Sequence, residues 1–255
     1  MLKSFAKKII AALPLSLIER SLLARFGYVV LSYSQHGEDA ILKDLFTGTR
    51  KGFYVDVGAH HPHRLSNTFW FYRQGWNGIN IDATPGSMKS FKKLRPRDIN
   101  IEAAISEKPT TLKFYPFTKP AFNTFSESLA KEHEMNGSIP LAAQTISTTR
   151  LENVLRSHIK PGQKIDFLTI DVEGLELEVL RSMDWSTFIP DVVVVEDIHS
   201  DPELPRSSLV FTFLKEKGYH LMAYTGKTFI FDRRSHTAGS ADNTHENSSS
   251  LSHIQ

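Results

Sequence analysis

Residues 53–60 read FYVDVGAH, and this stretch decides the fold. It is a short apolar run with one acid, followed by Gly58 and by a segment that can begin a helix. In an open α/β sheet, an extended ligand binds where such a strand turns into its helix. Because Gly58 has no Cβ, the backbone there can come close to a ligand. The stretch therefore predicts a sheet strand with a ligand site at its carboxyl end.

Strand-like and helix-like runs alternate from this stretch onward. Five runs have strand character: 53–57, 78–82, 99–104, 165–171 and 191–196. Five others have helix character: 66–74, 85–94, 149–158, 174–182 and 206–217. The alternation predicts βαβ units in a mostly parallel sheet. The last two apolar runs, 219–224 and 228–232, flank a turn and predict a closing antiparallel hairpin. We therefore expect an α/β fold with a seven-stranded, mostly parallel sheet.

Three segments interrupt or flank this pattern. Residues 117–148, after a short expected strand at 111–115, show no clear periodicity, so we expect a lid, a binding loop or disorder. Residues 235–255 are polar with almost no large apolar side chains, which predicts a disordered tail. We accordingly divide the chain into a helical extension (1–47), a main domain (48–234) and the tail.

The first 27 residues combine basic side chains with apolar residues at helical spacing. They contain no run near the about 20 apolar residues that a membrane span needs. Pro14 and the charged pair Glu19-Arg20 make a cleaved signal peptide a poor fit. We expect an amphipathic helix that packs on the domain or on a second subunit; the alternative is reversible attachment to an anionic membrane. We expect the protein in the cytoplasm; the alternative is peripheral contact with the inner face of the membrane.

The composition excludes several classes of function. The chain has 255 residues, 40% hydrophobic and 23% charged, which is ordinary for a globular protein. A formal net charge of +2 gives no case for nucleic-acid binding, which needs a strongly basic face. Because there is no cysteine, disulfides, thiolate nucleophiles and cysteine-ligated zinc are all excluded.

The residues around Gly58 point to a nucleoside cofactor without phosphates. Asp82 ends the next apolar run, about where a ribose-binding carboxylate lies in nucleotide-binding folds. A dinucleotide site would continue with a three-glycine fingerprint, but residues 60–63 read HHPH. S-adenosylmethionine needs an acid for its cationic end, a close glycine turn and an acid for its ribose. Asp56, Gly58 and Asp82 meet these needs; the alternative is that both acids only cap helices.

Three histidines follow the turn, at positions 60, 61 and 63. Side chains of an extended turn rarely converge on one ion, and Pro62 stiffens the segment. We therefore expect His60 to line the cleft rather than to bind a metal.

A second group of acids lies where two later strands end. Residues 165–174 read IDFLTIDVEG, and alternation along the chain directs Asp171 and Glu173 to the same side. The run at 192–195 ends in Glu196 and Asp197. If the two strands are neighbours, Asp171, Glu196 and Asp197 meet at one edge of the sheet, where an oxygen-rich cluster suits Mg²⁺. Capping and solvated acids are the alternative.

Without a metal, these acids suit proton transfer. Asp171 is the first candidate for a catalytic role, followed by Glu173 and His199, as general base toward a substrate hydroxyl. Upstream, Gln35 and Glu38 precede an apolar helix and are placed to fold over the cleft, while Ser34 or Gly37 would cap that helix.

Four segments together resemble the FkbM family of S-adenosylmethionine-dependent methyltransferases. They are SQHGED (34–39), DVGAH (56–60) with SNT (66–68), GWNGINID (75–82), and DVEG (171–174) with Glu176, Val179 and Leu180. They occur in the family's order, and the match extends from about residue 30 to 232. The resemblance implies a Rossmann-like methyltransferase fold and, usually, O-methylation of a sugar or polyketide hydroxyl.

The resemblance also implies a set of cofactor contacts. Asp56, Gly58, Ala59 and His60 would surround the methionine part, Asp82 the ribose, and Ala103-Ala104 the adenine. Five more positions complete the expected cofactor site: Gln35, Glu38, Asn67, Ala83 and Asp171. Related metal-dependent sugar methyltransferases use acids at the ends of the fourth and fifth strands, although metal dependence is not general in the family.

We therefore predict an O-methyltransferase that acts on a sugar, a glycan or a glycosylated small molecule. The 117–148 segment is the candidate for acceptor recognition. Two alternatives are a nicotinamide-dependent oxidoreductase and a non-catalytic nucleotide-binding module. The sequence leaves the acceptor, self-association and the use of Mg²⁺ open.

Overall fold

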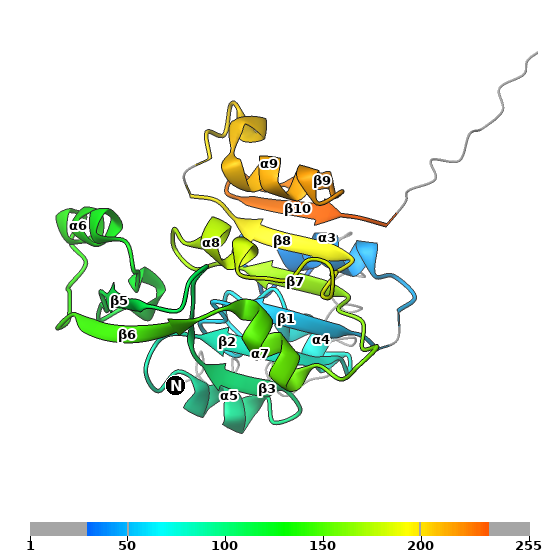
Figure 1. Cartoon of the computed structure of the whole chain (residues 1–255), viewed down its shortest axis with the longest axis horizontal. Coiled ribbons are helices and arrows are strands. Elements are labelled where there is room, and N and C mark those ends of the chain that lie inside the picture. The colour runs from blue at the N-terminus through cyan, green and yellow to red at the C-terminus, as the bar shows by residue number, and fades with distance from the viewer. Residues whose placement is uncertain (1–29, 50, 199, 235–255) are drawn as a thin grey trace, which may run out of the picture.

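The computed structural model describes residues 30–49, 51–198 and 200–234, and its centre is a seven-stranded sheet (Figure 1). The strand order is β3-β2-β1-β7-β8-β10-β9, and β10 alone runs opposite to the other six strands of this sheet. The strands are β1 Phe53–Val57, β2 Asn77–Asp82, β3 Ile99–Glu102, β7 Phe167–Ile170, β8 Val192–Glu196, β9 His220–Tyr224 and β10 Thr228–Asp232. The predicted α/β fold with a closing hairpin is confirmed.

The central strands are apolar because both of their faces are covered. All five residues of β1 and all five of β8 are buried. Alternate side chains enter two separate cores: Val55 and Val57 face one, and Tyr54 faces the other. Strands without an alternating pattern are typical of parallel sheets enclosed between helices.

Helices cover both faces of the sheet. On one face lie α7 Leu151–His158, α8 Glu176–Arg181 and α9 Leu209–Glu216, drawn in front of the sheet in Figure 1. On the other lie α3 Glu38–Leu45 and α4 Phe69–Arg73, which pack around Trp76 and Phe167. α5 Met88–Leu94 packs beside β3, and a short 3₁₀ turn, η2 Pro205–Ser207, precedes α9.

Residues 111–149 form a flap that projects to one side of the main sheet, with α6 at its far end (Figure 1). The flap contains β5 Thr111–Phe114, η1 Pro120–Phe122, α6 Glu127–Met135 and β6 Gln144–Thr149. Together with β4 Ala104–Ile105, its strands make a small sheet of order β4-β6-β5. The sequence therefore missed a helix and a strand within 117–148. The expected strand at 99–104 is also divided, because β4 leaves the main sheet to pair with β6.

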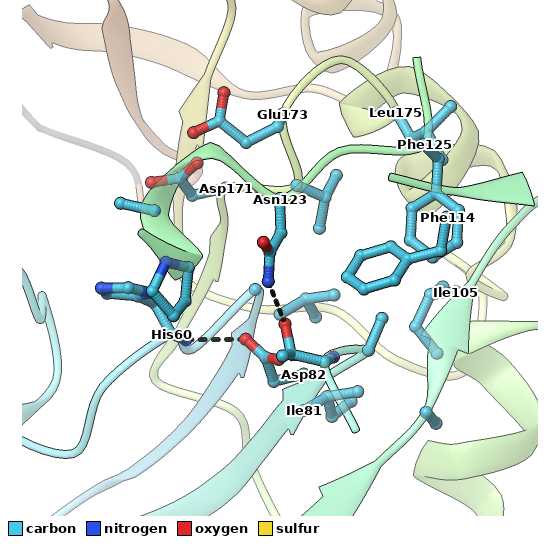
Figure 2. Close-up of a pocket in the computed structure, with 18 of the residues that line it drawn as sticks. His60, Ile81, Asp82, Ile105, Phe114, Asn123, Phe125, Asp171, Glu173 and Leu175 are labelled. Carbon is cyan, nitrogen blue, oxygen red and sulfur yellow. Dashed lines mark hydrogen bonds between the residues drawn. The ribbon is translucent and has the colours of Figure 1, made fainter. Parts of the chain in front are cut away.

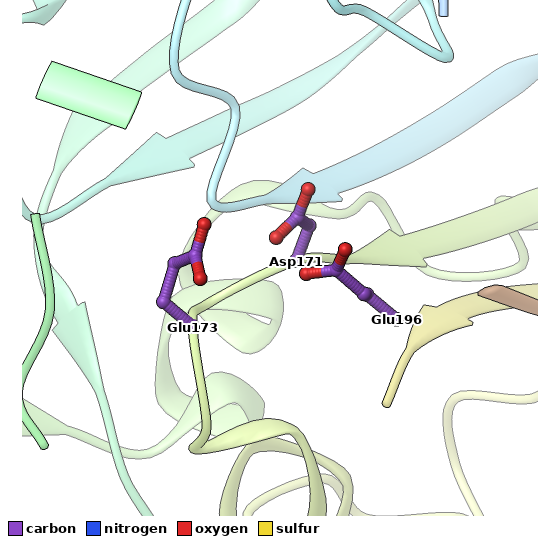
Figure 3. Close-up of side chains that lie close together, drawn as sticks. All are labelled: Asp171, Glu173 and Glu196. Atoms are coloured by element: carbon purple, nitrogen blue, oxygen red, sulfur yellow. The ribbon is translucent and has the colours of Figure 1, made fainter. Parts of the chain in front are cut away.

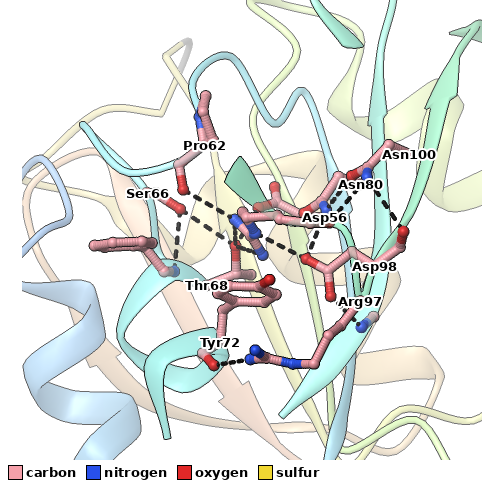
Figure 4. A network of polar contacts seen from close by, with 12 residues as sticks. Asp56, Pro62, Ser66, Thr68, Tyr72, Asn80, Arg97, Asp98 and Asn100 are labelled. Atoms are coloured by element: carbon pink, nitrogen blue, oxygen red, sulfur yellow. Dashed lines mark hydrogen bonds and ion pairs between the residues drawn. The ribbon is translucent and has the colours of Figure 1, made fainter. Parts of the chain in front are cut away.

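A buried polar network joins β1, β2 and α4 below the turn at Gly58 (Figure 4). The Arg95 side chain is fully buried and forms an ion pair with Asp98, with 2.7 Å between Nε and Oδ2. The same guanidinium donates to the hydroxyl oxygens of Tyr54 at 2.7 Å and Thr68 at 3.0 Å. Asp98 also accepts from the Gly78 N–H at 3.0 Å. The network ties the segment between α5 and β3 to strands β1 and β2 and to the start of α4.

The expectations for the two chain ends lie outside the described residues. This holds for the amphipathic helix within 1–29 and for the tail at 235–255. Within residues 30–49, 51–198 and 200–234, no helix has the length and apolar character needed to cross a membrane.

Candidate active site

A cleft opens where β1, β2 and β7 end, at the carboxyl edge of the sheet (Figure 2). Its larger cavity encloses ≈ 840 Å³ of empty space, open mouth included. The walls come from the turn after β1, the end of β2, the loop after β7 and the flap. Chain connections leave β1 and β7 in opposite directions, and this is the position at which doubly wound sheets bind ligands.

Gly58 allows the floor of the cavity to form. Its φ is +84°, and a Cβ at this position would lie 1.7 Å from the carbonyl oxygen of Asp171. The N–H groups of Gly58 and Ala59 both donate to the Ile81 carbonyl, at 2.9 and 3.0 Å. Only glycine permits this approach, which brings the ends of β1, β2 and β7 together.

Asp82 is fixed at the end of β2 by backbone donors. Its carboxylate accepts from the His60 N–H at 2.9 Å and from the Thr84 N–H at 2.8 Å (Figure 2). The side chain is buried but lines the cavity. Each carboxylate oxygen keeps a further lone pair, so Asp82 can still accept a hydrogen bond from a ligand hydroxyl.

The flap supplies the cavity wall opposite Asp82. Phe114 and Phe125 pack together with ring centroids 5.0 Å apart, beside Ile105 (Figure 2). Asn123 donates from Nδ2 to the Thr84 hydroxyl oxygen at 3.1 Å, and its Oδ1 accepts from the Phe117 N–H at 2.8 Å. Sequence reasoning did not assign these residues to the site. The available signal was the expected short strand at 111–115, whose apolar Phe114 had to face some covered surface.

Three residues with unusual backbone geometry line the same cavity. His60, Leu65 and Glu173 are the non-glycine residues with positive φ in the described part of the chain, at 50°, 52° and 54°. This conformation costs an ordinary residue about 1 kcal/mol or more, and such residues concentrate at functional sites. The strain therefore marks this cavity as functional.

Acidic side chains gather beside this cavity (Figure 3). Asp171, Glu173 and Glu196 each offer a carboxylate oxygen, and these atoms lie within 4.8 Å of one another. Glu196 is buried, while Asp171 is exposed because its side chain opens onto the cavity. β7 and β8 are parallel neighbours, as the predicted meeting of Asp171 and Glu196 required.

The proximity of these acids raises their pKa values. Burial and the charges of Glu196 and Glu176 raise the pKa of Glu173 to about 8. Desolvation by the neighbouring protein atoms and the charges of Glu196 and Glu173 raise the pKa of Asp171 well above its usual range, although the side chain opens onto the cavity. A cation placed among these groups would relieve the repulsion, so the cluster favours a positively charged ligand.

Glu176 holds the loop that carries two of these acids. Its carboxylate accepts from the Val172 N–H at 3.1 Å and from the Gly174 N–H at 3.0 Å. Burial raises the pKa of Glu176 to about 7, although these backbone donors act in the opposite direction. The Asp171–Gly174 loop thus has a fixed shape before any ligand binds.

Not all residues assigned from the sequence lie in the larger cavity. Eight line it: Gln35, Gly58, His60, Asp82, Ala83, Ala103, Asp171 and Glu173. Glu38 and Asn67 line a smaller cavity next to it. Ala59 is buried against Met88 and Phe91, and Ala104 is buried in β4.

Asp56 and Asp197 point away from the cleft. Asp56 accepts from the Thr68 hydroxyl at 2.7 Å, inside the Arg95 network, and burial raises its pKa to about 6. Asp197 accepts from the Ser208 hydroxyl at the start of α9. Glu173 therefore takes the place expected for Asp197 among the clustered acids. His199 lies outside the described residues.

The histidines after Gly58 serve the turn itself. The Nδ1 atom of His61 accepts from the backbone N–H groups of His63 at 3.2 Å and Arg64 at 3.1 Å. Burial lowers the pKa of His61 to about 4. His60 alone of the three lines the cavity, where its backbone bonds to Asp82.

Solved methyltransferases resemble the chain at low identity. One from Geobacter sulfurreducens is 12% identical, covering 91% of this chain and 97% of its own, with a TM-score of 0.40. A TehB-like SAM-dependent methyltransferase from Corynebacterium glutamicum is 12% identical (85% and 95% covered, TM-score 0.37). An O-methyltransferase from Bacillus cereus, solved in complex with SAH, is 8% identical (84% and 96% covered, TM-score 0.38). Among curated proteins, none matches the chain.

The family comparison is more specific. The Methyltransferase FkbM domain matches residues 56–221. The match begins within β1, ends within β9, and contains the turn at Gly58, Asp82 and the clustered acids. The resemblance noted in the sequence is confirmed, and the protein is an S-adenosylmethionine-dependent methyltransferase. On this evidence the chain belongs to the FkbM methyltransferase family.

Proposed function

We propose that this methyltransferase methylates a hydroxyl group of a sugar, a glycan or a glycosylated small molecule. The observation that carries the proposal is one continuous cleft with three kinds of wall. An apolar wall lies on the flap, a fixed carboxylate lies at the end of β2, and clustered acids lie at the ends of β7 and β8.

The cavity fits S-adenosylmethionine in both shape and charge. Ile105, Phe114 and Phe125 offer an apolar surface for adenine, and Asp82 offers a hydrogen-bond acceptor to the ribose hydroxyls. Asp171 and Glu173 supply negative charge for the end that bears the sulfonium and ammonium groups. When bound, the cofactor supplies a methyl group that is already activated toward nucleophiles.

The charges of the cleft argue against the nicotinamide alternative. Within the described part of the chain, no lysine or arginine lines either cavity. A dinucleotide carries a diphosphate, which needs basic side chains or a glycine-rich helix start. Carboxylates at the same positions would repel it.

The chemistry assigned to the protein is positioning and proton removal. The acceptor oxygen forms a bond to the methyl carbon, the carbon–sulfur bond breaks with its electron pair left on sulfur, and the hydroxyl proton passes to a carboxylate. Asp171 is our choice for that carboxylate, because it lies between the two cavities and so faces both the cofactor and the acceptor side of the cleft. Alignment of the two substrates contributes the larger part of such a transfer.

The clustered acids also support a second role, the binding of Mg²⁺. Asp171, Glu173 and Glu196 provide the carboxylate oxygens that hard divalent cations prefer. A cation held there would polarise the acceptor oxygen. Activity that survives EDTA assigns the cluster to proton transfer, whereas activity lost in EDTA and restored by Mg²⁺ assigns it to the metal.

The proposal is tested in two stages. Calorimetric titration compares S-adenosylmethionine, S-adenosylhomocysteine and NAD; we expect the first two to bind and NAD not to bind. Tritiated S-adenosylmethionine is then incubated with isolated glycan and glycolipid fractions, and hydrolysis with mass spectrometry identifies O-methyl sugars. Label found only on nitrogen or on protein would overturn the acceptor assignment. Asp171→Asn should lower turnover at saturating S-adenosylmethionine at least 100-fold; near-normal turnover under that condition removes Asp171 from the mechanism.

A further inference from the structure

The cleft continues past Asp171 into a smaller, polar cavity. Gln35, Leu65 and Asp171 line both cavities, so the two meet at these residues. The smaller one lies between the ends of β7, β8 and β10, on the side of Asp171 away from Asp82 and the flap. An acceptor placed there would approach the cofactor from the side opposite the adenosine.

The smaller cavity is lined by groups that bind hydroxyls and amines. Glu38 and Glu196 contribute carboxylates and are only 2% and 7% exposed. Asn67 and Thr228 contribute an amide and a hydroxyl. Glu38 accepts from the His36 N–H at 2.9 Å and from the Thr225 hydroxyl at 3.1 Å, and the His36 Nδ1 atom lies 3.6 Å from its carboxylate.

The two cavities together contain far more negative than positive charge. Their lining includes five carboxylates, namely Glu38, Asp82, Asp171, Glu173 and Glu196. The described residues provide no lysine or arginine to the lining. Lys227 is close enough to oppose the rise in the pKa of Glu173, but no salt bridge links it to any of the five acids.

The ligands already assigned to the cleft do not neutralise it. S-adenosylmethionine carries one net positive charge, and a divalent ion would add two. With S-adenosylmethionine alone and both Asp171 and Glu173 protonated, three carboxylates face one positive charge; with a divalent ion bound, which ionises both acids, five carboxylates face three positive charges, so the cleft stays negative in either case. A carboxylate or phosphate on the acceptor would thus enter a site that repels it at short range in a poorly screened environment.

We propose that the reacting hydroxyl of the acceptor enters the smaller cavity, and that the sugar bearing this hydroxyl is neutral or amine-bearing, without a carboxylate or phosphate near the methylated position. This inference rests on the proposed function and restricts its substrate class. In a nucleoside-diphosphate sugar, the diphosphate is attached to the same ring that carries the hydroxyls, so it lies close to any hydroxyl that could be methylated. Glycosyl transfer must therefore precede methylation and supply the substrate of this enzyme.

The test compares matched probes on the S-adenosylhomocysteine-loaded full chain. Methyl glucoside, methyl glucosaminide, methyl glucuronide and UDP-glucose are measured at equal millimolar concentration by saturation-transfer NMR, with EDTA and with Mg²⁺. We expect signals from the glucoside and the glucosaminide to exceed those from the two anionic probes at least threefold in both buffers. Equal or stronger binding of an anionic probe, or binding of none of the four, overturns the inference. A chain that fails to bind S-adenosylhomocysteine contradicts the proposed function itself.

Charge variants provide a second arm. Glu196→Gln and Glu38→Gln remove one lining charge each, and each should raise the glucuronide signal relative to the glucoside at least twofold. Glu127→Gln removes the same charge on α6, where the Glu127 side chain is 63% exposed, and should leave the ratio unchanged. An equal change in all three variants would show that net charge alone decides, and would overturn the assignment to this cavity.

Discussion

The Thr124 hydroxyl donates a hydrogen bond to the carbonyl oxygen of Glu173, at 3.0 Å. Thr124 lies in the flap and is 1% exposed, and Glu173 lies in the loop after β7 with a positive φ. The same hydroxyl oxygen accepts from the Ser126 N–H at 3.0 Å. One buried side chain therefore connects the wall of the cofactor cavity to an acid of the cluster.

Thr124→Val should disturb the Glu173 loop without removing the flap. The change keeps the side-chain shape but leaves a buried carbonyl and an N–H unpaired, which should destabilise the protein by about 1–3 kcal/mol. We expect turnover to fall about tenfold. In hydrogen exchange, addition of S-adenosylhomocysteine should protect residues 172–175 in the wild type and no longer in the variant, while residues 112–125 stay protected. Thr124→Ser, which keeps the hydroxyl, is the control; equal protection of 172–175 in all three proteins would contradict the connection.

Gly58→Ala should abolish cofactor binding. The added Cβ would lie 1.7 Å from the Asp171 carbonyl oxygen, so one of the two loops must move. Gly75→Ala is the matched control, because Gly75 has a similar φ of +92° and no atom within 4 Å of the added Cβ. In both variants, placing alanine at a positive φ costs about 1 kcal/mol. Only Gly58→Ala should raise the Kd for S-adenosylhomocysteine at least 100-fold; similar values in the two variants would show that backbone strain alone matters.

Cofactor binding should tighten as pH rises. The pKa of Glu173 is raised to about 8 in the folded protein, whereas an ordinary glutamate has a pKa of about 4.3. Since the folded state binds this proton more tightly, the free energy of unfolding of the ligand-free chain should decrease as pH rises from about 5 to 8. A cationic ligand favours the ionised acid, so its binding should release protons over the same interval. Calorimetry at pH 6.5 in buffers of different ionisation enthalpy measures that release, and Glu173→Gln should reduce it; an unchanged release in Glu173→Gln would remove Glu173 as its source.

Arg95→Met should be among the most destabilising substitutions in this chain. It leaves the buried Asp98 carboxylate without its cationic partner, which typically costs about 3–5 kcal/mol. Arg156→Met breaks an ion pair with Asp184 whose arginine is 55% exposed, and such pairs contribute about 1 kcal/mol at most. Urea unfolding of both variants measures the difference. Equal losses would show that the Arg95 network contributes no more than a surface pair.

The sequence predicted the parts of the site that central strands carry. β1 and β8 are buried on both faces, so their apolar runs were unambiguous, and the acids that end β7 and β8 had to meet once the strands paired. The sequence could not predict which way the Asp56 side chain points. Alternation along a strand assigns side chains to two faces, but it does not show which face holds a hydrogen-bond partner. The partner of Asp56 is the Thr68 hydroxyl, held in the network of Arg95, and Arg95 follows the basic helix α5 and looks like a solvated residue in the sequence.

Within the flap, the sequence predicted the strand that became β5 and a lid or binding loop, but it missed α6 and β6. β6 reads QTISTT, and of its residues only Thr148 is buried, so neither face shows an apolar pattern. Its strand conformation comes from pairing with β5 and β4, which are distant in the sequence. Tertiary pairing of this kind overrides local propensity and leaves no local signature.

Ala103 connects β3 of the main sheet directly to β4 of the flap sheet. Its N–H donates to the Asp82 carbonyl at 3.0 Å. A nucleoside bound against Ala103 would contact both sheets at their junction and would stabilise the connection between them. Heating the empty enzyme should therefore release the flap at a lower temperature than the body, and the two melting steps should merge into one when the nucleoside is bound.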